Sequence, residues 1–183
     1  MLLNAYSEAH MLDSCLIRKV TESDLPMVLA WRNHKDVRGY MFTQHEISLY
    51  EHRNWFFKAN HDPSRCLLIV EEAKQAIGYV QFSKVANGAI ADWGFYARPD
   101  APKGTGRKLG TMALNHAFGP LKLHKVCGQA IGSNEASIVF HQRLGFTLEG
   151  VLRDQQRIEG VYHSLHCFGL LSTEWQPKAV IQE

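Results

Sequence analysis

The chain has 183 residues, 45% of them hydrophobic, and its 20 basic and 18 acidic residues leave a formal net charge of +2. This length and apolar content suit a single domain, residues 1–183, with a full core. The balanced charge gives no reason to expect nucleic acid or a membrane as partner, so any anion site must be local. The first fifteen residues lack the features of a secretion signal, and no run is long enough to span a membrane, so we expect a cytoplasmic protein.

Cysteine and histidine spacing gives no indication of a metal site. The four cysteines lie far apart, without the paired spacing of a zinc site. His163 and His166 are three residues apart on an expected strand, where they would point to opposite faces. We therefore expect a protein without a metal.

The N-terminal third predicts one strand followed by two helices. Residues 15–20 are typical of a strand, and residues 25–34 of a helix with Thr21 or Ser23 as its cap. Helical spacing of apolar residues predicts a second helix over residues 47–59.

The remainder of the chain predicts six further strands and two further helices. The expected strands are 66–72, 76–85, 89–97, 124–131, 145–154 and 161–171, and the expected helices begin near residues 105 and 134. The Asn87-Gly88 dipeptide is typical of a hairpin turn. We expect a flexible tail after about residue 175. The order of elements predicts a three-layer α/β (α+β) domain, a mixed sheet with helices packed on it.

Two glycines stand at a turn from strand to helix. Gly104 and Gly106 follow a strand expected to end near Ala97, at the start of a helix expected near Thr105. Backbone N–H groups and the helix dipole make such a turn favourable for an anion. Basic residues surround it, namely Lys103, Arg107 and Lys108. The motif is neither a Walker loop nor a dinucleotide fingerprint, and alone it fits a plain turn equally well.

A second polar segment is NEASIVFHQRLGF, residues 134–146. Asn134 is a good helix cap, and Ser137 and His141, four residues apart, share one helix face. By itself the segment also fits a capped amphipathic helix with a solvated histidine.

Together, the G-T-G turn and the N-x-x-S-x-x-F-H-x-x-x-G-F segment resemble the GCN5-related N-acetyltransferase (GNAT) family over nearly the whole chain. The resemblance implies a mostly antiparallel sheet of about seven strands flanked by about four helices, splayed between the fourth and fifth strands. Acetyl-CoA would lie in that opening, with its pyrophosphate on the glycine turn. The Gln or Arg that usually opens this motif is Ala101 here, a loss that binding through backbone N–H groups should tolerate. The implied cofactor contacts are Phe95, Tyr96, Ala97, Lys103, Gly104, Thr105, Gly106, Arg107, Lys108, Asn134, Ser137, Phe140 and His141.

The implied reaction is direct transfer to an amine, without a metal. A backbone N–H near Tyr96 would polarise the thioester carbonyl, and Gln81 would lie near the reacting amine. His141 occupies the place where many members carry a tyrosine that protonates the departing thiolate. Imidazole, with an ordinary pKa near 6.5, can act as that general acid when part of its population is protonated. Acetylation of Cys127 is a less favoured alternative, since no base neighbours it in sequence.

Basic and aromatic residues interleave over residues 30–57, which suits an anionic ligand with a flat ring, or equally a helix pair with core aromatics. The patterns W-R-N-H-x-x-V-R-x-Y-M and I-S-x-x-E-H-x-x-W-F resemble nucleotide-amino-sugar acetyltransferases of pseudaminic acid biosynthesis, a route to flagellin glycosylation. The resemblance implies acetylation of the 4-amino group of UDP-4-amino-4,6-dideoxy-N-acetyl-β-L-altrosamine. The implied diphosphate contacts are Arg32, His52, Ser83 and Lys84, and the implied uracil walls are Met41, Phe42 and Trp55.

Two alternatives stay open. The segment GFTLEGVLRD, residues 145–154, also resembles acetyltransferases of protein N-termini, including those of ribosomal proteins. A non-catalytic acetyl-CoA sensor would fit Ala101 and the absent tyrosine. The sequence leaves the oligomeric state open as well, with a homodimer among the options.

Overall fold

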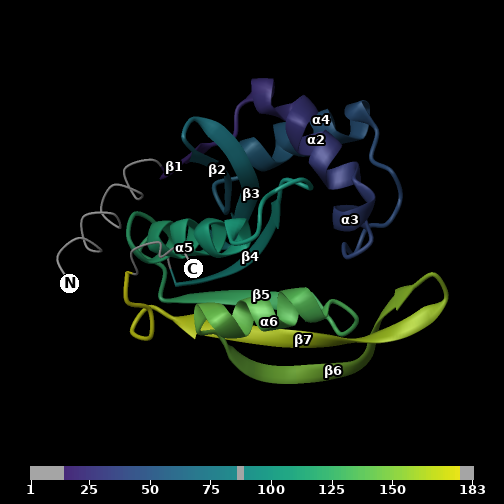
Figure 1. The fold of residues 1–183 in the computed structure, drawn as a ribbon, viewed down its shortest axis with the longest axis vertical. Helices are drawn as coiled ribbons and strands as arrows, with labels where there is room; N and C mark the ends of the chain where they lie inside the picture. Colours follow the sequence, from purple (N-terminus) through teal and green to yellow (C-terminus); the bar gives the residue numbers. More distant parts are fainter. Residues whose placement is uncertain (1–14, 86–88, 178–183) are drawn as a thin grey trace.

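The computed structural model describes residues 15–85 and 89–177, which form a seven-stranded sheet with helices on both faces (Figure 1). The strand order is β1-β2-β3-β4-β5-β7-β6. The strands are β1 (Cys15–Lys19), β2 (Arg65–Glu72), β3 (Gln75–Ser83), β4 (Ile90–Ala97), β5 (Lys125–Ile131), β6 (Thr147–Ile158) and β7 (Val161–Leu171). The helices are the 3₁₀ turn η1 (Glu22–Asp24), α2 (Leu25–Asn33), α3 (Lys35–Arg38), α4 (Leu49–Asn60), α5 (Thr105–Phe118) and α6 (Glu135–Leu144).

Two apolar clusters lie on opposite faces of the sheet, because neighbouring residues of a strand point to opposite sides. Ile69 of β2 packs in one cluster with Val28 of α2 and Phe56 of α4. Val70, the next residue, packs in the other with Leu109 of α5. Both faces of β2 are therefore buried, which explains its unbroken apolar run and gives the expected three layers.

The expected elements are present, with small differences at their ends. Ser48 caps α4 by accepting a hydrogen bond from the Glu51 backbone N–H, and Asn134 caps α6 by accepting one from the Ser137 N–H. The four-residue helix α3 was not predicted, because it is too short to show a periodic pattern. The expected turn at Asn87-Gly88 and the end of the expected flexible tail, residues 178–183, lie outside the described residues.

The sheet opens between β4 and β5, as the family resemblance implied. These strands are parallel and pair only through residues 90–92 and 125–127. β4 continues to pair with β3 as far as Ala97, and β5 with β7 as far as Ile131. Beyond Asp92, β4 turns away from β5 toward the side where α3 lies (Figure 1). One edge of the end of β4 is thus left without a strand partner in the described sheet.

No helix among the described residues is both long and apolar enough to cross a membrane. The described residues also contain no group of three or more His, Cys, Asp or Glu side chains placed to hold a metal ion.

Candidate active site

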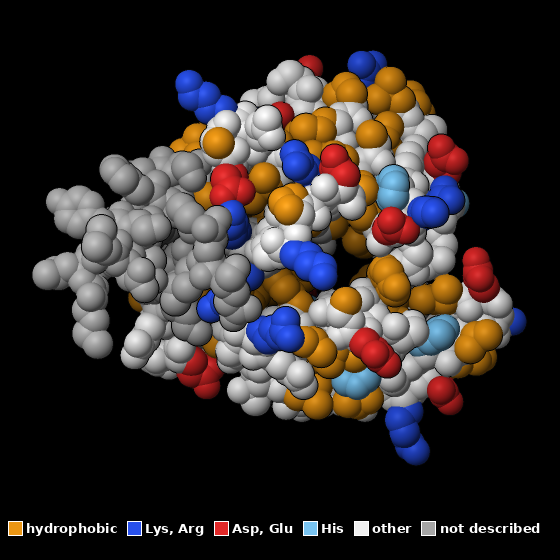
Figure 2. Space-filling model, in the orientation of Figure 1, with side chains coloured by type: hydrophobic (Ala, Val, Ile, Leu, Met, Phe, Trp, Pro, Cys, Tyr) orange, Lys and Arg blue, Asp and Glu red, His pale blue; other side chains and the backbone are white. Residues whose placement is uncertain are grey.

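A cavity of about 620 Å³ occupies the opening between β4 and β5. Its walls come from the end of β4, from β5, from the first turns of α6 and from the segment after α3. Figure 2 shows the surface hollowed between the half that carries α2 and α3 and the half that carries β5, β7 and α6, with hydrophobic side chains along the border. A deep, largely apolar hollow with a few polar groups is the usual form of a substrate site.

The end of β4 forms one wall of this cavity. Phe95, Tyr96 and Ala97 line it, while their backbone groups on the other edge pair with β3. Because β5 has already diverged, backbone N–H and C=O groups on the open edge of β4 are available to an extended ligand. The arrangement fits a chain that binds as an additional strand.

The opposite wall begins at the N-terminus of α6. The Asn134 side chain accepts a hydrogen bond of 3.0 Å from the Ser137 backbone N–H, which fixes the first turn of the helix. Asn134, Ser137 and Phe140 all line the cavity. The capped helix therefore presents its polar start and one aromatic ring to the same space as β4.

The glycine turn lies next to this wall. Gly104 is the N-cap of α5, where no side chain forms a capping hydrogen bond. Its φ of +91° is a backbone conformation that favours glycine. Within the described part of the chain, the backbone N–H of Gly106 has no hydrogen-bond partner. A Cβ on Gly106 would lie 3.6 Å from the Phe140 ring, so the turn adjoins the cavity. A helix N-terminus with a glycine turn in this position suits a phosphate group.

The basic residues of the turn differ in their surroundings. Lys103 and Arg107 lie on the turn or in the first turn of α5. Lys108 forms an ion pair with Glu72 of β2, and both side chains are mostly buried. Its ammonium group already has an anionic partner, so the structure favours an α5–β2 contact over the cofactor contact expected from the sequence.

His141 is packed behind the cavity wall and does not line it. Its side chain is 1% exposed; Nδ1 donates to the Ser137 carbonyl at 2.7 Å, and Nε2 accepts from Nε1 of Trp93 at 3.1 Å. Burial lowers the pKa of His141 below its ordinary value. A buried, neutral ring with both nitrogens engaged has no proton to offer a thiolate, so this geometry is unfavourable for the expected general-acid role.

The expected acceptor residues fall into two groups. Met41, Phe42, Gln81 and Ser83 line the cavity, on the side away from α6. Lys84 follows them in sequence, but its ammonium group pairs with the carboxylate of Asp92 at 2.6 Å.

Arg32, His52 and Trp55 form a second group behind Tyr96, which we call the inner layer. His52 is 4% exposed and stacks on Trp55 with ring centroids 5.2 Å apart. Nη2 of Arg32 donates to the Thr43 carbonyl at 2.8 Å. Among the described residues, Arg32 Nη1 and His52 Nδ1 are buried without a hydrogen-bond partner. Burial lowers the pKa of both groups, and the Arg32 charge lowers the pKa of His52 further. Buried polar atoms without partners are uncommon and suggest a missing ligand.

Two tyrosines connect the inner layer to the cavity. Tyr96 stacks on Tyr79 at 5.0 Å and donates its hydroxyl to the Val28 carbonyl at 3.5 Å. Burial raises the pKa of Tyr96, so its phenol remains protonated at neutral pH. The Tyr79 hydroxyl donates to Oε1 of Gln81 at 3.1 Å and so orients that amide.

Sequence reasoning missed the place of Trp93 and Tyr79, which lie on the neighbouring strands β4 and β3, where buried aromatic residues are common. Cys127 lies on the cavity wall. Burial raises the pKa of the Cys127 thiol, which weakens it as a nucleophile and disfavours the covalent alternative.

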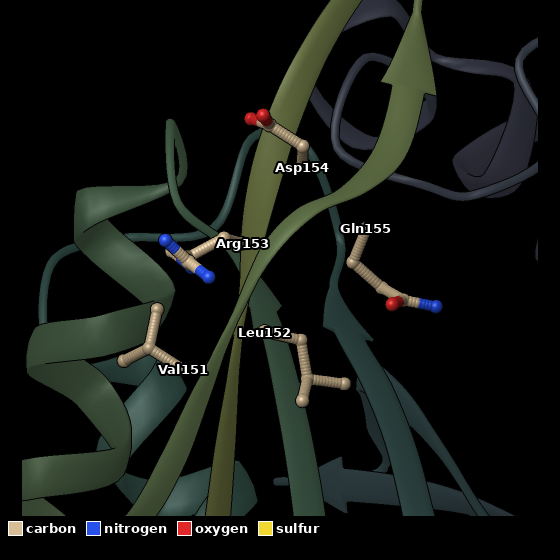
Figure 3. Close-up of a pocket in the computed structure, with 5 residues that line it drawn as sticks. All are labelled: Val151, Leu152, Arg153, Asp154 and Gln155. Atoms are coloured by element: carbon tan, nitrogen blue, oxygen red, sulfur yellow. The ribbon is translucent and has the colours of Figure 1, made fainter.

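A second hollow lies on the edge strand β6 and is lined by residues 151–155 alone. Val151 and Arg153 point to the side of a neighbouring helix, whereas Leu152 and Gln155 point to the other side (Figure 3). Asp154 has a positive φ of 51°, within a break in the β6–β7 register. These side chains do not converge, so we place the active site in the β4–β5 opening.

Comparison with known proteins identifies the family. Residues 15–147 match the acetyltransferase (GNAT) domain family. The chain belongs to the GNAT acetyltransferase family.

Relatives of this GNAT chain have different names. Acetyltransferase PseH of Campylobacter jejuni (strain 81-176) is 26% identical over 130 residues, 71% of this chain and 81% of the relative. Spermidine N(1)-acetyltransferase of Vibrio cholerae is 25% identical over 162 residues, 87% of this chain and 94% of the relative. The crystal structure of the Vibrio cholerae spermidine N-acetyltransferase with CoA and spermine has a TM-score of 0.81 at 25% identity, covering 88% and 98% of the two chains.

This GNAT enzyme is accordingly an acetyl-CoA-dependent N-acetyltransferase. The residues present fit that cofactor: the open edge of β4 suits the pantetheine arm, and the Gly104 turn suits the pyrophosphate.

Proposed function

We propose that this N-acetyltransferase acetylates the 4-amino group of a UDP-4-amino-dideoxy sugar, UDP-4-amino-4,6-dideoxy-N-acetyl-β-L-altrosamine, in cytoplasmic pseudaminic acid biosynthesis. The observation that carries the proposal is the inner layer, where Arg32 Nη1 and His52 Nδ1 are buried without partners in the described structure. A half-buried guanidinium with one buried, unused N–H group favours an anionic ligand such as a diphosphate. The sequence resemblance in residues 30–57 supports the same acceptor.

The acceptor would enter between the segment after α3 and the end of β4. Met41 and Phe42 line the cavity there and offer apolar walls to a uracil ring. The Thr43 carbonyl, held by Arg32, belongs to the same segment. In this arrangement the diphosphate extends past Tyr96 into the inner layer and pairs with Arg32. The nucleoside then lies next to the walls formed by Met41 and Phe42.

In the proposed reaction the neutral amine attacks the thioester carbonyl of acetyl-CoA. A C–N bond forms, the C–S bond breaks, and the proton lost by the amine balances the one gained by the thiolate. A backbone N–H near Tyr96, on the open edge of β4, polarises the carbonyl. Gln81, oriented by Tyr79, positions the amine. Acetyl-CoA supplies the activated acyl group, and the protein supplies position and exclusion of water.

A polyamine is the second candidate acceptor. Asp36 and Asp92 line the cavity, and a carboxylate is the natural partner of an ammonium group. The similar Vibrio cholerae enzyme is named for spermidine. Against this candidate, Lys84 already pairs with Asp92, and the half-buried charge of Arg32 would repel a polycation.

The test is an assay of thiol release from acetyl-CoA with three acceptors: the UDP-4-amino sugar, spermidine and an N-terminal peptide. We expect the largest kcat/KM for the nucleotide sugar. A larger value for spermidine or the peptide would refute the proposed acceptor and assign the other one. Tight CoA binding without release for any amine would indicate a sensor.

Arg32→Ala separates the proposed diphosphate contact from a general effect. We expect it to raise KM for the nucleotide sugar about tenfold or more, because a charged hydrogen bond is worth about 1.5–3 kcal/mol. Arg53→Ala, an exposed arginine on α4 beside His52, is the matched control and should change KM less than about twofold. An unchanged KM in Arg32→Ala, with acetyl-CoA affinity intact, contradicts the phosphate role.

A further inference from the structure

The hydrogen-bonded pairing of β4 and β5 ends at the start of the opening, and the next residues of both strands contact one helix. Asp92 pairs with Cys127 at the end of the short parallel ladder. The next residues are Trp93 on β4, which is 8% exposed, and Gly128 on β5. His141 of α6 lies against both, so three elements join where the opening begins.

Gly128 makes this junction possible. A Cβ at this position would lie 2.7 Å from Nε1 of Trp93 and closer still to Nε2 of His141. Only a residue without a side chain lets the imidazole and the indole approach each other over the strand. The Trp93–His141 hydrogen bond therefore crosses β5 and connects β4 directly to α6.

We propose that His141 is a positioning residue, a neutral imidazole that ties Trp93 of β4 to the Ser137 carbonyl of α6 across Gly128 and so fixes the width of the acetyl-CoA cavity. We call this connection the His141 bridge. It rests on the acetyl-CoA site of the family and is independent of the acceptor.

The bridge acts on the cofactor walls through short connections. Ser137 accepts from His141 and itself lines the cavity. Phe140, next to His141, stacks on Trp93 at 6.2 Å and lies against Phe95 at 4.7 Å, and both Phe140 and Phe95 line the cavity. Loss of the bridge would leave a buried indole N–H without an acceptor and free α6 to shift relative to β4.

The bridge requires the unprotonated form of Nε2, because the lone pair of Nε2 accepts the Trp93 N–H. The groups that face the imidazole carry no charge: Trp93, Phe95, Gly128, the Ser137 carbonyl, Phe140, Phe146 and Phe168. Titratable residues near these along the strands are Asp92, Tyr96, Cys127, His166 and Cys167. Asp92 is paired with Lys84, and the His166 ring lies beyond Phe168 at 6.5 Å from it.

The test compares His141→Gln with His141→Phe. Gln can place an amide oxygen near the Nε2 position and accept from Trp93, whereas Phe keeps a ring of similar shape but has no acceptor. We expect the Phe variant to raise the Kd of acetyl-CoA about tenfold, the equilibrium effect of one buried hydrogen bond, and Gln to recover most of it. His116→Phe, a half-buried histidine on α5, is the matched control and should leave the Kd unchanged.

The indole N–H of Trp93 reports the bridge directly. The chain has four tryptophans, and Trp93→Phe assigns the relevant signal in a proton–nitrogen NMR spectrum. We expect this signal to move in His141→Phe and to stay near its wild-type position in His141→Gln. If His141→Phe does not fold, the nitrogen NMR chemical shifts of the His141 ring in the wild-type protein still test the bridge. The bridge requires a proton on Nδ1 and none on Nε2 at neutral pH, and any other protonation state would refute it.

The pH profile distinguishes the bridge from acid catalysis by its sign. Because the folded pKa of His141 is lowered, the bridge is present above that pKa and lost as pH falls through it, so acetyl-CoA affinity should fall on the acid side. This fall of acetyl-CoA affinity at low pH should be absent in His141→Gln. A general acid instead predicts that kcat falls as pH rises. The bridge is refuted if Gln loses as much turnover as Phe with an unchanged Kd, or if the Trp93 signal does not respond to His141→Phe.

Discussion

Gly104→Ala tests whether the turn before α5 holds the cofactor pyrophosphate. Gly104 has φ +91°, and a Cβ added there would meet no atom within 4 Å. The substitution therefore introduces backbone strain and no collision. A left-handed conformation costs a residue with a side chain about 1–2 kcal/mol relative to glycine.

The strain has a predictable effect on binding. Without ligand, the variant can relax this residue toward negative φ and thereby reorient the N–H groups at the start of α5. Acetyl-CoA must restore the original turn, so binding is weakened by the strain energy. For about 1–2 kcal/mol, the Kd should rise about 5- to 30-fold, measured by calorimetric titration of the folded variant.

Gly160→Ala is a matched control. Gly160 has φ +87°, also with no atom within 4 Å of an added Cβ, but it lies in the turn between β6 and β7. Only Gly104→Ala should lose acetyl-CoA affinity, because the Gly160 turn lies away from the cavity-lining residues. Equal affinity in the two variants would refute the assignment of the Gly104 turn to the pyrophosphate.

Two further predictions concern ion pairs. Arg18 binds both carboxylate oxygens of Asp24 and lowers the pKa of Asp24 to about 2, so this pair stabilises the fold above the unfolded pKa and is lost as pH falls from about 4 to about 2. In urea unfolding, Asp24→Asn should be about 2 kcal/mol less stable than wild type at pH 7, and a difference that does not shrink over that acid interval would contradict this account. Lys108→Met should cost about 1–3 kcal/mol of stability, because the largely buried Glu72 carboxylate loses its partner, and should leave the Kd of acetyl-CoA within about twofold; a tenfold rise in Kd would return Lys108 to the cofactor site.

Local signals were sufficient to predict the fold, the cap of α6 and the turn before α5. Asn134 caps a helix through its own backbone neighbours, and Gly104 sets a turn within a few residues, so both can be recognised from short segments. The alternation of strands and helices likewise fixed the layers, because each element's apolar pattern matches its period.

The acceptor side and the state of His141 could not be predicted in the same way. The partner of His141, Trp93, lies 48 residues away in sequence, and only the packing of α6 on the sheet buries the ring between them. Arg32 and His52 were grouped correctly as neighbours of aromatic rings, but their depth behind Tyr96 depends on how α2 and α4 pack on β3. Burial and hydrogen-bond partners are tertiary properties, which sequence spacing does not encode.

The parallel pairing of β4 and β5 has a consequence for the origin of the phosphate site. Antiparallel neighbours can be joined by a tight turn, but a parallel pair requires a crossover that carries the chain back along the sheet, and here that crossover contains α5. A crossover helix starts near the carboxyl end of the first strand, which is also where β4 has turned away from its neighbour. The topology of this one connection therefore delivers a helix N-terminus to the mouth of the opening, where the proposed anion site requires only the glycines of the turn in addition.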